Sequence, residues 1–320
     1  MTDTRTLGHS DIEVPALGIG CNAFGARTDA DEVVAIVDAA IEEGVAFFDT
    51  ADVYSLGESE TLLGRAIVGR RDEVVVATKF GMDLQGLNGD DGGRRGAPEY
   101  VRTAIEASLR RLGTDHVDLY QLHTPDPATP IEETLGALHE LVQEGKVRAI
   151  GCSNFQAWQL VDAAWQARTR DLTPFATAQN EYSLYNPVAE VELTPASAAL
   201  GVGILPYFPL AYGLLTGKYA KGEAAPAGSR LEQQEQRLAD ADWDRVETLQ
   251  RIADGAGASL LELAIGGLAA RPQVSSVIAG ISRPQQVAAN AAAARWRPDA
   301  SVTAQLDDLA RPRHSYTTFA

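Results

Sequence analysis

Short apolar runs alternate with longer segments of helical period along most of the chain. Eight short, largely apolar segments predict buried strands: residues 14–20, 45–48, 74–78, 117–122, 147–151, 175–178, 202–206 and 276–279. Eight segments with apolar positions every three to four residues predict helices: residues 29–43, 58–68, 98–112, 131–144, 156–168, 188–200, 260–270 and 283–294. Each predicted strand is followed by one predicted helix, an alternation that is typical of a parallel sheet.

Eight strand–helix units predict a (β/α)8 TIM barrel of the α/β class, formed as a single domain over residues 1–320. An open doubly wound sheet shows the same alternation, but eight units rather than five or six favour closure. Ahead of the first barrel strand, residues 5–14 predict a β-hairpin that turns at residues 8–11. We therefore expect a closed barrel with an N-terminal β-hairpin.

Two long connections interrupt the repeat. Residues 81–97 follow the third predicted strand, and residues 209 to about 240 follow the seventh. Both leave the C-terminal ends of strands, where barrel active sites are built, so we expect them to form lids or walls of a pocket. A disordered surface insertion is the alternative for residues 88–95, which are rich in Gly and charge. The last residues, 310–320, either fold over the pocket or extend into solvent.

The composition is that of an ordinary globular protein, with 45% hydrophobic and 22% charged residues. There are 27 Lys and Arg against 44 Asp and Glu, and the formal net charge of −17 disfavours binding to nucleic acid or to an anionic membrane. No apolar run reaches the roughly 18 residues of a membrane span, and residues 1–5 do not begin a signal peptide, so we expect a cytoplasmic protein. Cys21 and Cys152 predict free thiols, and no cluster of residues predicts a metal site.

Polar residues follow three neighbouring predicted strands. Asp49, with Tyr54 shortly after it, follows the second strand, Lys79 the third and His123 the fourth. Taken singly, each has a more ordinary role, as a cap, a packing residue or a structural imidazole. Lys79 is the hardest to explain in that way, because the chain has only four Lys and this one directly follows an apolar strand. A Lys buried there needs a carboxylate partner, and Asp49 on the neighbouring strand is the nearest one.

Together these four side chains can deliver a proton. A Tyr hydroxyl has a pKa of about 10, and a nearby ammonium lowers it by stabilising the phenolate. We therefore expect Tyr54 to act as a general acid toward a carbonyl oxygen, with Lys79 beside it. His123 then orients the same oxygen, and Asp49 keeps Lys79 charged and in place.

These residues resemble the aldo-keto reductases, NAD(P)H-dependent oxidoreductases built on a (β/α)8 barrel. The sequence FDTADVY at residues 48–54, with GESE at 57–60, resembles the family's segment that carries the catalytic Asp and Tyr. TKFG at 78–81 and LYQLH at 119–123 resemble the segments of its catalytic Lys and His. The resemblance extends from the hairpin to Asn290 and is to bacterial-type members related to the branch that contains channel beta subunits.

The resemblance also implies where a nicotinamide cofactor is held. GCSNF at 151–155 and QNEY at 179–182 are similar to the segments that hold the carboxamide, and GLLTGK at 213–218 to the segment along the pyrophosphate. GISR at 280–283 is similar to the segment at the adenosine end. The implied cofactor residues are Cys21, Asn22, Asp49, Ser153, Asn154, Gln179, Tyr207, Phe208, Pro209, Leu210, Gly213, Leu215, Lys218, Gly280, Ser282, Arg283, Gln286 and Asn290.

Two details bear on the cofactor. A helix N-terminus beside Ser282 and Arg283 suits a phosphate, so we expect NADP(H) rather than NAD(H). Relatives commonly carry Ser where this chain has Phe208, and the lost hydroxyl removes a cofactor contact of about 1 kcal/mol.

The predicted function is NADPH-dependent reduction of an aldehyde or ketone to an alcohol, with a small-molecule carbonyl or alcohol as substrate. The predicted pocket walls are Asn22, Phe24, Met82, Leu84 and Trp158, although Trp158 is equally compatible with a core position.

One alternative is a cofactor-binding regulatory barrel with little turnover, since the family includes regulatory subunits of membrane channels. The acidic helices and the complete catalytic set favour the enzyme. A barrel hydrolase or isomerase that uses Asp49 and His123 leaves the cofactor-like segments unexplained. Either a monomer or a homo-oligomer fits the sequence.

Overall fold

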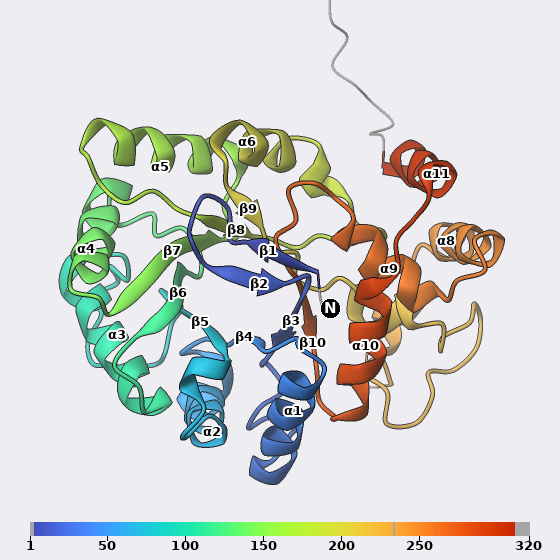
Figure 1. Ribbon diagram of the computed structural model, residues 1–320, viewed down its shortest axis with the longest axis horizontal. Coiled ribbons are helices and arrows are strands. Elements are labelled where there is room, and N and C mark those ends of the chain that lie inside the picture. Colours follow the sequence, from blue (N-terminus) through green and yellow to red (C-terminus); the bar gives the residue numbers. More distant parts are fainter. Residues whose placement is uncertain (1–2, 233, 311–320) are drawn as a thin grey trace, which may run out of the picture.

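A computed structural model describes residues 3–232 and 234–310 and contains a parallel sheet of eight strands (Figure 1). The strands, in their order around the sheet, are β10 (Val277–Gly280), β3 (Leu17–Gly20), β4 (Phe47–Asp49), β5 (Val75–Phe80), β6 (Val117–Leu122), β7 (Val147–Ser153), β8 (Thr177–Gln179) and β9 (Gly203–Ile204). Parallel bridges then join Ile204 to Val274 and Tyr207 to Ile278, which brings the last strand in the order back to the first. The predicted (β/α)8 barrel is confirmed.

The register of the strands gathers their C-terminal ends at one edge. Asp49 is level with Ala77, Lys79 with Gln121, and Ser153 with Gln179. Because all the strands run in parallel, the polar residues that end them meet at the mouth of the barrel.

Most helices lie within a few residues of their predicted positions and cover the outside of the barrel (Figure 1). They are α1 (Ala30–Glu42), α2 (Glu58–Ala66), α3 (Pro98–Leu112), α4 (Ile131–Gln143), α5 (Ala157–Thr169), α6 (Leu193–Leu200), α9 (Leu260–Ala269) and α10 (Gln285–Arg295). The helix predicted at residues 188–200 is shorter than expected, because its first turn is the separate 3-10 turn η3 (Val188–Glu190).

Three further helices were not predicted: α7 (Glu235–Ala239), α8 (Trp243–Gly255) and α11 (Ala300–Ala310). The amphipathic period of α8 is present in the sequence, with Val246, Leu249 and Ile252 buried and with Asp242 capping its first turn. Within the described residues, no single helix has the length and apolar character of a membrane span, although α8 and α9, bent at 88°, meet the criterion as a pair.

The predicted hairpin consists of β1 (Thr4–Thr6) and β2 (Glu13–Pro15), paired antiparallel. Its apolar residues Leu7, Ile12 and Val14 are buried against side chains that point into the barrel. Gly8 lies against the backbone of residues 176 and 203, just before β8 and at the start of β9. The hairpin therefore closes the end of the barrel at which the strands begin, and leaves the opposite end open.

Both long connections start at the open end, as predicted, but only the second one lines the cavity found there, and residues 81–97 contribute no side chain to its wall. Residues 81–97 contain no helix or strand, whereas the connection after β9 contains the 3-10 turn η4 (Ala211–Thr216) and α7. Shorter 3-10 turns, η1 (Tyr54–Gly57) and η2 (Arg71–Glu73), flank α2. The predictions for the C-terminal segment concern residues 310–320, and apart from Ala310, which ends α11, these residues lie outside the described part of the chain.

Candidate active site

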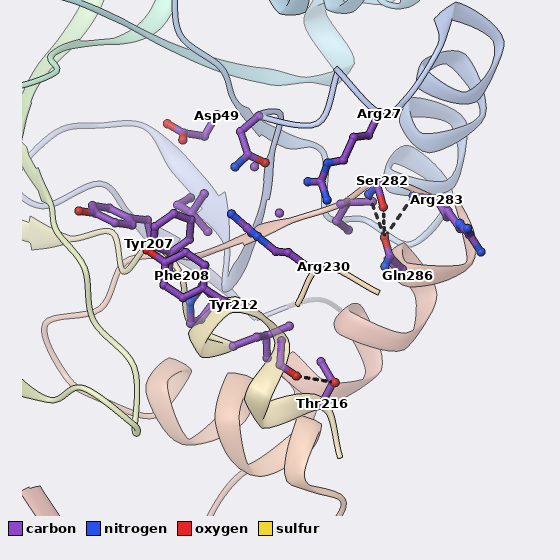
Figure 2. A pocket seen from close by; sticks show the side chains of 18 of the residues that line it. Arg27, Asp49, Tyr207, Phe208, Tyr212, Thr216, Arg230, Ser282, Arg283 and Gln286 are labelled. Atoms are coloured by element: carbon purple, nitrogen blue, oxygen red, sulfur yellow. Dashed lines mark hydrogen bonds between the residues drawn. The ribbon is translucent and has the colours of Figure 1, made fainter. Parts of the chain in front are cut away.

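A cavity of about 600 Å³ opens at the C-terminal ends of the strands (Figure 2). Its size is that of a small-molecule or cofactor site. Most of the predicted site residues line it: Asn22, Asp49, Tyr54, His123, Ser153, Asn154, Gln179, Tyr207, Phe208, Pro209, Leu210, Gly213, Lys218, Gly280, Ser282, Arg283 and Gln286.

Four predicted site residues do not line this cavity. Lys79 is fully buried beneath it, and Cys21 and Leu215 are also fully buried. Asn290, on α10, is 5% exposed. The Cys21 thiol donates to the carbonyl of Ile19 at 3.4 Å and so points back into the protein.

Lys79 joins the two other groups predicted to act with it. Its Nζ donates to Asp49 Oδ2 at 2.7 Å, to the carbonyl of Thr50 at 2.8 Å and to the hydroxyl of Tyr54 at 3.4 Å. The ammonium therefore has three acceptors although no part of it reaches solvent. A buried charge needs this degree of pairing to stay ionised.

The environment moves the pKa values of these groups in different ways. Burial lowers the pKa of Lys79, but Asp49 and Tyr54 together raise it by more, so the net pKa lies above its usual value. Burial raises the pKa of Tyr54, and the Lys79 ammonium lowers it only in part, so the net pKa of Tyr54 is also raised. The predicted lowering by Lys79 is present, but burial outweighs it.

His123 lies beside Tyr54, with the two ring centroids 5.9 Å apart and the rings nearly perpendicular. Burial, with a further contribution from Lys79, lowers the pKa of His123 to about 3. Its Nδ1 has no hydrogen-bond partner within the described residues. A neutral imidazole is therefore available next to the Tyr54 hydroxyl.

Amide side chains surround Asp49 and the adjoining part of the cavity. Gln121 and Gln179 each donate to Asp49 Oδ1, at 3.1 and 3.0 Å. Asn154, held at a positive φ of 61°, donates to the carbonyl of His123 at 2.9 Å and accepts from the Tyr207 hydroxyl at 2.7 Å. This network fixes a set of neutral donors and acceptors close to Tyr54.

The other end of the cavity is cationic. Arg27, Lys218, Arg230 and Arg283 line it, and none of them forms an ion pair with a carboxylate within residues 3–232 and 234–310. Burial lowers the pKa of Arg230, and the like charges of Arg27 and of Arg237 on α7 lower it further. These cations have no carboxylate partner among the described residues, although the chain carries 44 Asp and Glu. A group of unpaired cations is the type of site that binds an anion.

Gln286 bonds to the turn that precedes α10 (Figure 2). Its Oε1 accepts from the backbone N–H of Ser282 at 2.8 Å and of Arg283 at 3.1 Å. These amides, at the start of a helix, are donors suited to a phosphate oxygen. The predicted residues Ser282, Arg283 and Gln286 are thus brought together at the cationic end.

Phe208 gives this end an aromatic surface in place of a hydroxyl. Its ring lies 4.5 Å from that of Tyr212, and the Arg230 guanidinium lies 5.2 Å from the ring of Phe208 and 5.0 Å from the ring of Tyr212. Stacking of this kind positions a guanidinium without neutralising it. Phe208 and Tyr212 both adopt positive φ, 53° and 60°, so the tight turn after β9 orients both rings.

Sequence reasoning missed Arg27, Tyr212 and Arg230, which line the cavity, and included Thr216 only as part of the segment 213–218. No local pattern distinguishes Arg27 and Arg230 from the other arginines of the chain. Of the predicted pocket walls, only Asn22 lines this cavity. Phe24 and Leu84 are buried, and Met82 and Trp158 are 37% and 64% exposed. Trp158 is therefore neither a wall of this cavity nor a core residue.

In the described part of the chain, no three His, Cys, Asp or Glu residues come together in a way that could hold a metal ion.

Comparison with known proteins places the geometry in context. The sequence model of the Aldo/keto reductase family matches residues 16–311. A probable voltage-gated potassium channel subunit beta from Oryza sativa subsp. japonica is 37% identical over 89% of each chain. The uncharacterized oxidoreductase YrpG from Bacillus subtilis is 33% identical over 95% of this chain and 94% of its own. The solved structure of aldo-keto reductase AKR11C1 from Bacillus halodurans, in its holo form, covers 99% of both chains with a TM-score of 0.81 and 30% identity.

Proposed function

The chain belongs to the aldo/keto reductase family, and from that membership we propose that it reduces an aldehyde or ketone to an alcohol with NADPH, using Tyr54 as general acid. The family and its fold support an oxidoreductase that acts on small carbonyl compounds with a nicotinamide cofactor. The observation that carries the finer proposal is the buried contact of Lys79 with both Asp49 and the Tyr54 hydroxyl.

Tyr54 supplies the proton in the proposed reaction. A bound reduced nicotinamide supplies the hydride for the carbonyl carbon, and the carbonyl oxygen takes the proton of the Tyr54 hydroxyl as negative charge develops on it. The resulting phenolate lies next to the Lys79 ammonium, which stabilises it. Regaining one proton from solvent returns Tyr54 to its starting state.

His123 and Asp49 assist without transferring the proton. A neutral His123 can donate one hydrogen bond to the substrate oxygen and so fix its position against Tyr54. Asp49 balances the charge of Lys79 at 2.7 Å. Removing the Asp49 carboxylate would leave Lys79 as an unpaired buried cation, which is strongly unfavourable.

The residues of the cavity fit a nicotinamide dinucleotide. Ser153, Asn154, Gln179 and Tyr207 are the residues that would hold its nicotinamide end. The unpaired cations at the opposite end of the cavity, with the amides of Ser282 and Arg283, would hold its phosphates. The number of free cations favours NADP(H), which carries one more phosphate than NAD(H).

The first experiment follows the absorbance of the reduced cofactor with a reactive aromatic aldehyde, using NADPH and then NADH. We expect turnover with a preference for NADPH. Tyr54→Phe should lower kcat at least 100-fold, because general-acid catalysis contributes about 10²–10⁴-fold, while NADPH binding stays near that of the unchanged chain. Unchanged turnover in this variant would remove Tyr54 as the acid.

The preference for NADPH is tested separately with Arg283→Ala. We expect the Kd for NADPH to rise about tenfold or more, with a smaller change for NADH, because a charged hydrogen bond to phosphate is worth about 1.5–3 kcal/mol. Arg295→Ala is the matched control, since Arg295 lies on α10 and pairs with Glu43 instead. Equal losses for both cofactors would indicate that Arg283 serves packing only.

A regulatory barrel is the second candidate, favoured by the similarity to a protein described as a probable channel subunit beta. Tight NADPH binding without turnover of any aldehyde would support it.

We also infer that the chain is a single domain, because every described strand belongs to the barrel or to the hairpin that closes it. Its two cysteines are buried free thiols, which supports a place in the reducing cytoplasm.

A further inference from the structure

Exposed apolar side chains gather on one outer helix, α5. Trp158, Val161 and Trp165 are 64%, 47% and 61% exposed, and their spacing of three and four residues places them on one face. The opposite face of the helix, with Leu160, Ala163 and Ala167, is buried. Two of the four tryptophans of the chain therefore lie on one solvent-facing stripe, which we call the α5 stripe, and the catalytic proposal uses neither of them.

The polar groups of α5 bond to one another rather than across the stripe. The indole N–H of Trp158 donates to Gln156 at 2.6 Å, and Gln166 donates to Asp162 at 3.1 Å. If another surface covered the rings, these donors would keep their acceptors. Burying the α5 stripe therefore removes apolar area from water at little cost in hydrogen bonds.

Few charged residues lie on the two helices of this region. α5 carries one Asp and one Arg, and α6, which lies beside it (Figure 1), carries no charged residue. By contrast, α1 carries four acidic residues and α4 carries three, with no Lys or Arg in either. Two copies of a chain with net charge −17 repel each other, and contact between faces that carry few acidic residues adds little to that repulsion.

We propose that the α5 stripe is an interface between two copies of this chain. The spacing is self-complementary: in an antiparallel pair of α5 helices related by a two-fold axis near Val161, Trp158 of each copy meets Trp165 of the other. Such contacts between identical patches are the usual form of homodimers. Tryptophan is also among the residue types enriched at protein interfaces.

The available area makes this a reversible dimer. Four indoles that are about three-fifths exposed can bury on the order of 500 Å², whereas a stable interface needs about 1,200–2,000 Å² in total. The rest of the interface would have to come from flanking residues of α5 and α6. We therefore expect dissociation on dilution to low micromolar concentration, and tighter association in high salt, which screens the repulsion between the copies.

Sedimentation velocity of the full chain, from about 1 to 200 µM in low and high salt, tests the proposal. We expect the sedimentation coefficient to rise with concentration, more steeply in high salt, and the tryptophan emission to shift to shorter wavelength as the dimer forms. Val161→Lys places two like charges at the proposed axis and should raise the dissociation constant at least tenfold. The double variant Trp158→Gln with Trp165→Gln should do the same, and both act on exposed positions.

Val68→Lys is the matched control, because Val68 is 79% exposed and lies outside α5. It should associate as the unchanged chain does. A chain that stays monomeric at 200 µM in high salt would overturn the proposal, even if the stripe then proved to bind a different protein. Association that the α5 variants leave intact, or that weakens with salt, would overturn it as well. None of these readouts depends on the proposed enzyme activity.

Discussion

The Tyr54 hydroxyl is subject to two opposing influences that differ in physical origin. Burial raises its pKa by penalising the phenolate, and the Lys79 ammonium lowers it by stabilising that phenolate. A chain that placed Tyr54 in the same pocket without Lys79 would hold a still weaker acid. The contact at 3.4 Å between Lys79 Nζ and the hydroxyl thus limits the effect of burial on the group proposed to supply the proton.

The pH dependence of carbonyl reduction follows from these directions. Reduction needs the protonated form of Tyr54, so kcat/KM should be level through neutral pH and fall only as pH rises through the raised pKa of Tyr54. His123, with its pKa lowered to about 3, stays neutral over the same range and should add no step near pH 6.5. Initial rates at saturating cofactor from pH 5 to 10.5 measure this. A clear ionisation between pH 5 and 8 would contradict it.

Lys79→Met tests the part played by the ammonium. Removing it takes away the influence that lowers the pKa of Tyr54, so the alkaline fall should move to higher pH while the plateau rate drops by 100-fold or more. Lys221→Met is the control, since Lys221 is exposed and pairs with Asp244. A slow variant whose pH profile stays in place would mean that Lys79 acts by packing alone.

Two helices and a strand are linked behind the turn that carries Tyr54. Arg111 on α3 donates to Glu60 on α2 at 2.6 Å, and Glu60 accepts from Thr78 on β5, the residue before Lys79. Arg111 also packs over Gly57, where an added Cβ would lie 2.7 Å from its Cδ. Because residues 55–57 all have positive φ, this contact supports a backbone path that the local sequence disfavours.

Arg111→Met measures the strength of that link. Glu60 has no exposed surface, so the loss of its partner leaves a buried unpaired charge and should lower the free energy of unfolding by about 3–5 kcal/mol. Urea unfolding gives the value, and Arg110→Met, on the exposed neighbour, is the matched control. Combining Arg111→Met with Glu60→Gln should recover part of the loss. If the Arg110 and Arg111 variants cost the same, the ion pair contributes nothing to stability.

At the scale of elements, the sequence was sufficient where structure follows from local pattern. Buried strands read as apolar runs and most barrel helices as amphipathic segments, so the barrel and its polar strand ends were predicted. The helix α8 was missed although its amphipathic period is present in the sequence. The turn at residues 208–212 was not predictable, since Phe208 and Tyr212 adopt positive φ, which such residues rarely do.

Over the whole molecule, the four residues predicted to act in catalysis lie together at one end of the cavity, whereas several residues of the cationic end were not predicted. The strand register, which any parallel barrel imposes, places Asp49 and Lys79, and Tyr54 and His123 follow shortly after the ends of β4 and β6. Arg230 reaches the cavity only because the long connection after β9 folds back over it, and no local pattern specifies such a return. The exposed position of Trp158 was equally hidden, since an indole on a helix is compatible with a core, a pocket or a surface.

We expect changes at the hairpin end of the barrel to affect stability and changes at the cavity end to affect activity. A substitution of Gly8 in the hairpin tests this expectation. Gly8 has a φ of +56°, and an added Cβ would lie 2.0 Å from the carbonyl oxygen of Ala176. Gly69 shares the positive φ, at +77°, but nothing lies within 4 Å of its Cβ position. Gly69→Ala should therefore report backbone strain alone, about 1–2 kcal/mol. Gly8→Ala should cost a further 1–3 kcal/mol, because the hairpin must shift away from the barrel floor.

Urea unfolding of the two variants measures the difference between their free energies of unfolding. Steady-state kinetics shows whether the change at Gly8 affects kcat at the opposite end of the barrel. Since the hairpin closes the end opposite the cavity, we expect kcat of the folded Gly8→Ala protein to stay within about twofold of the unchanged chain, because strain at the floor does not alter the contacts of Lys79. Equal losses of stability in the two variants would mean that the hairpin is not packed tightly against β8 and β9. A large fall in kcat at unchanged stability would mean that the hairpin end and the cavity end of the barrel are coupled. The strands would then transmit a displacement from one end to the other.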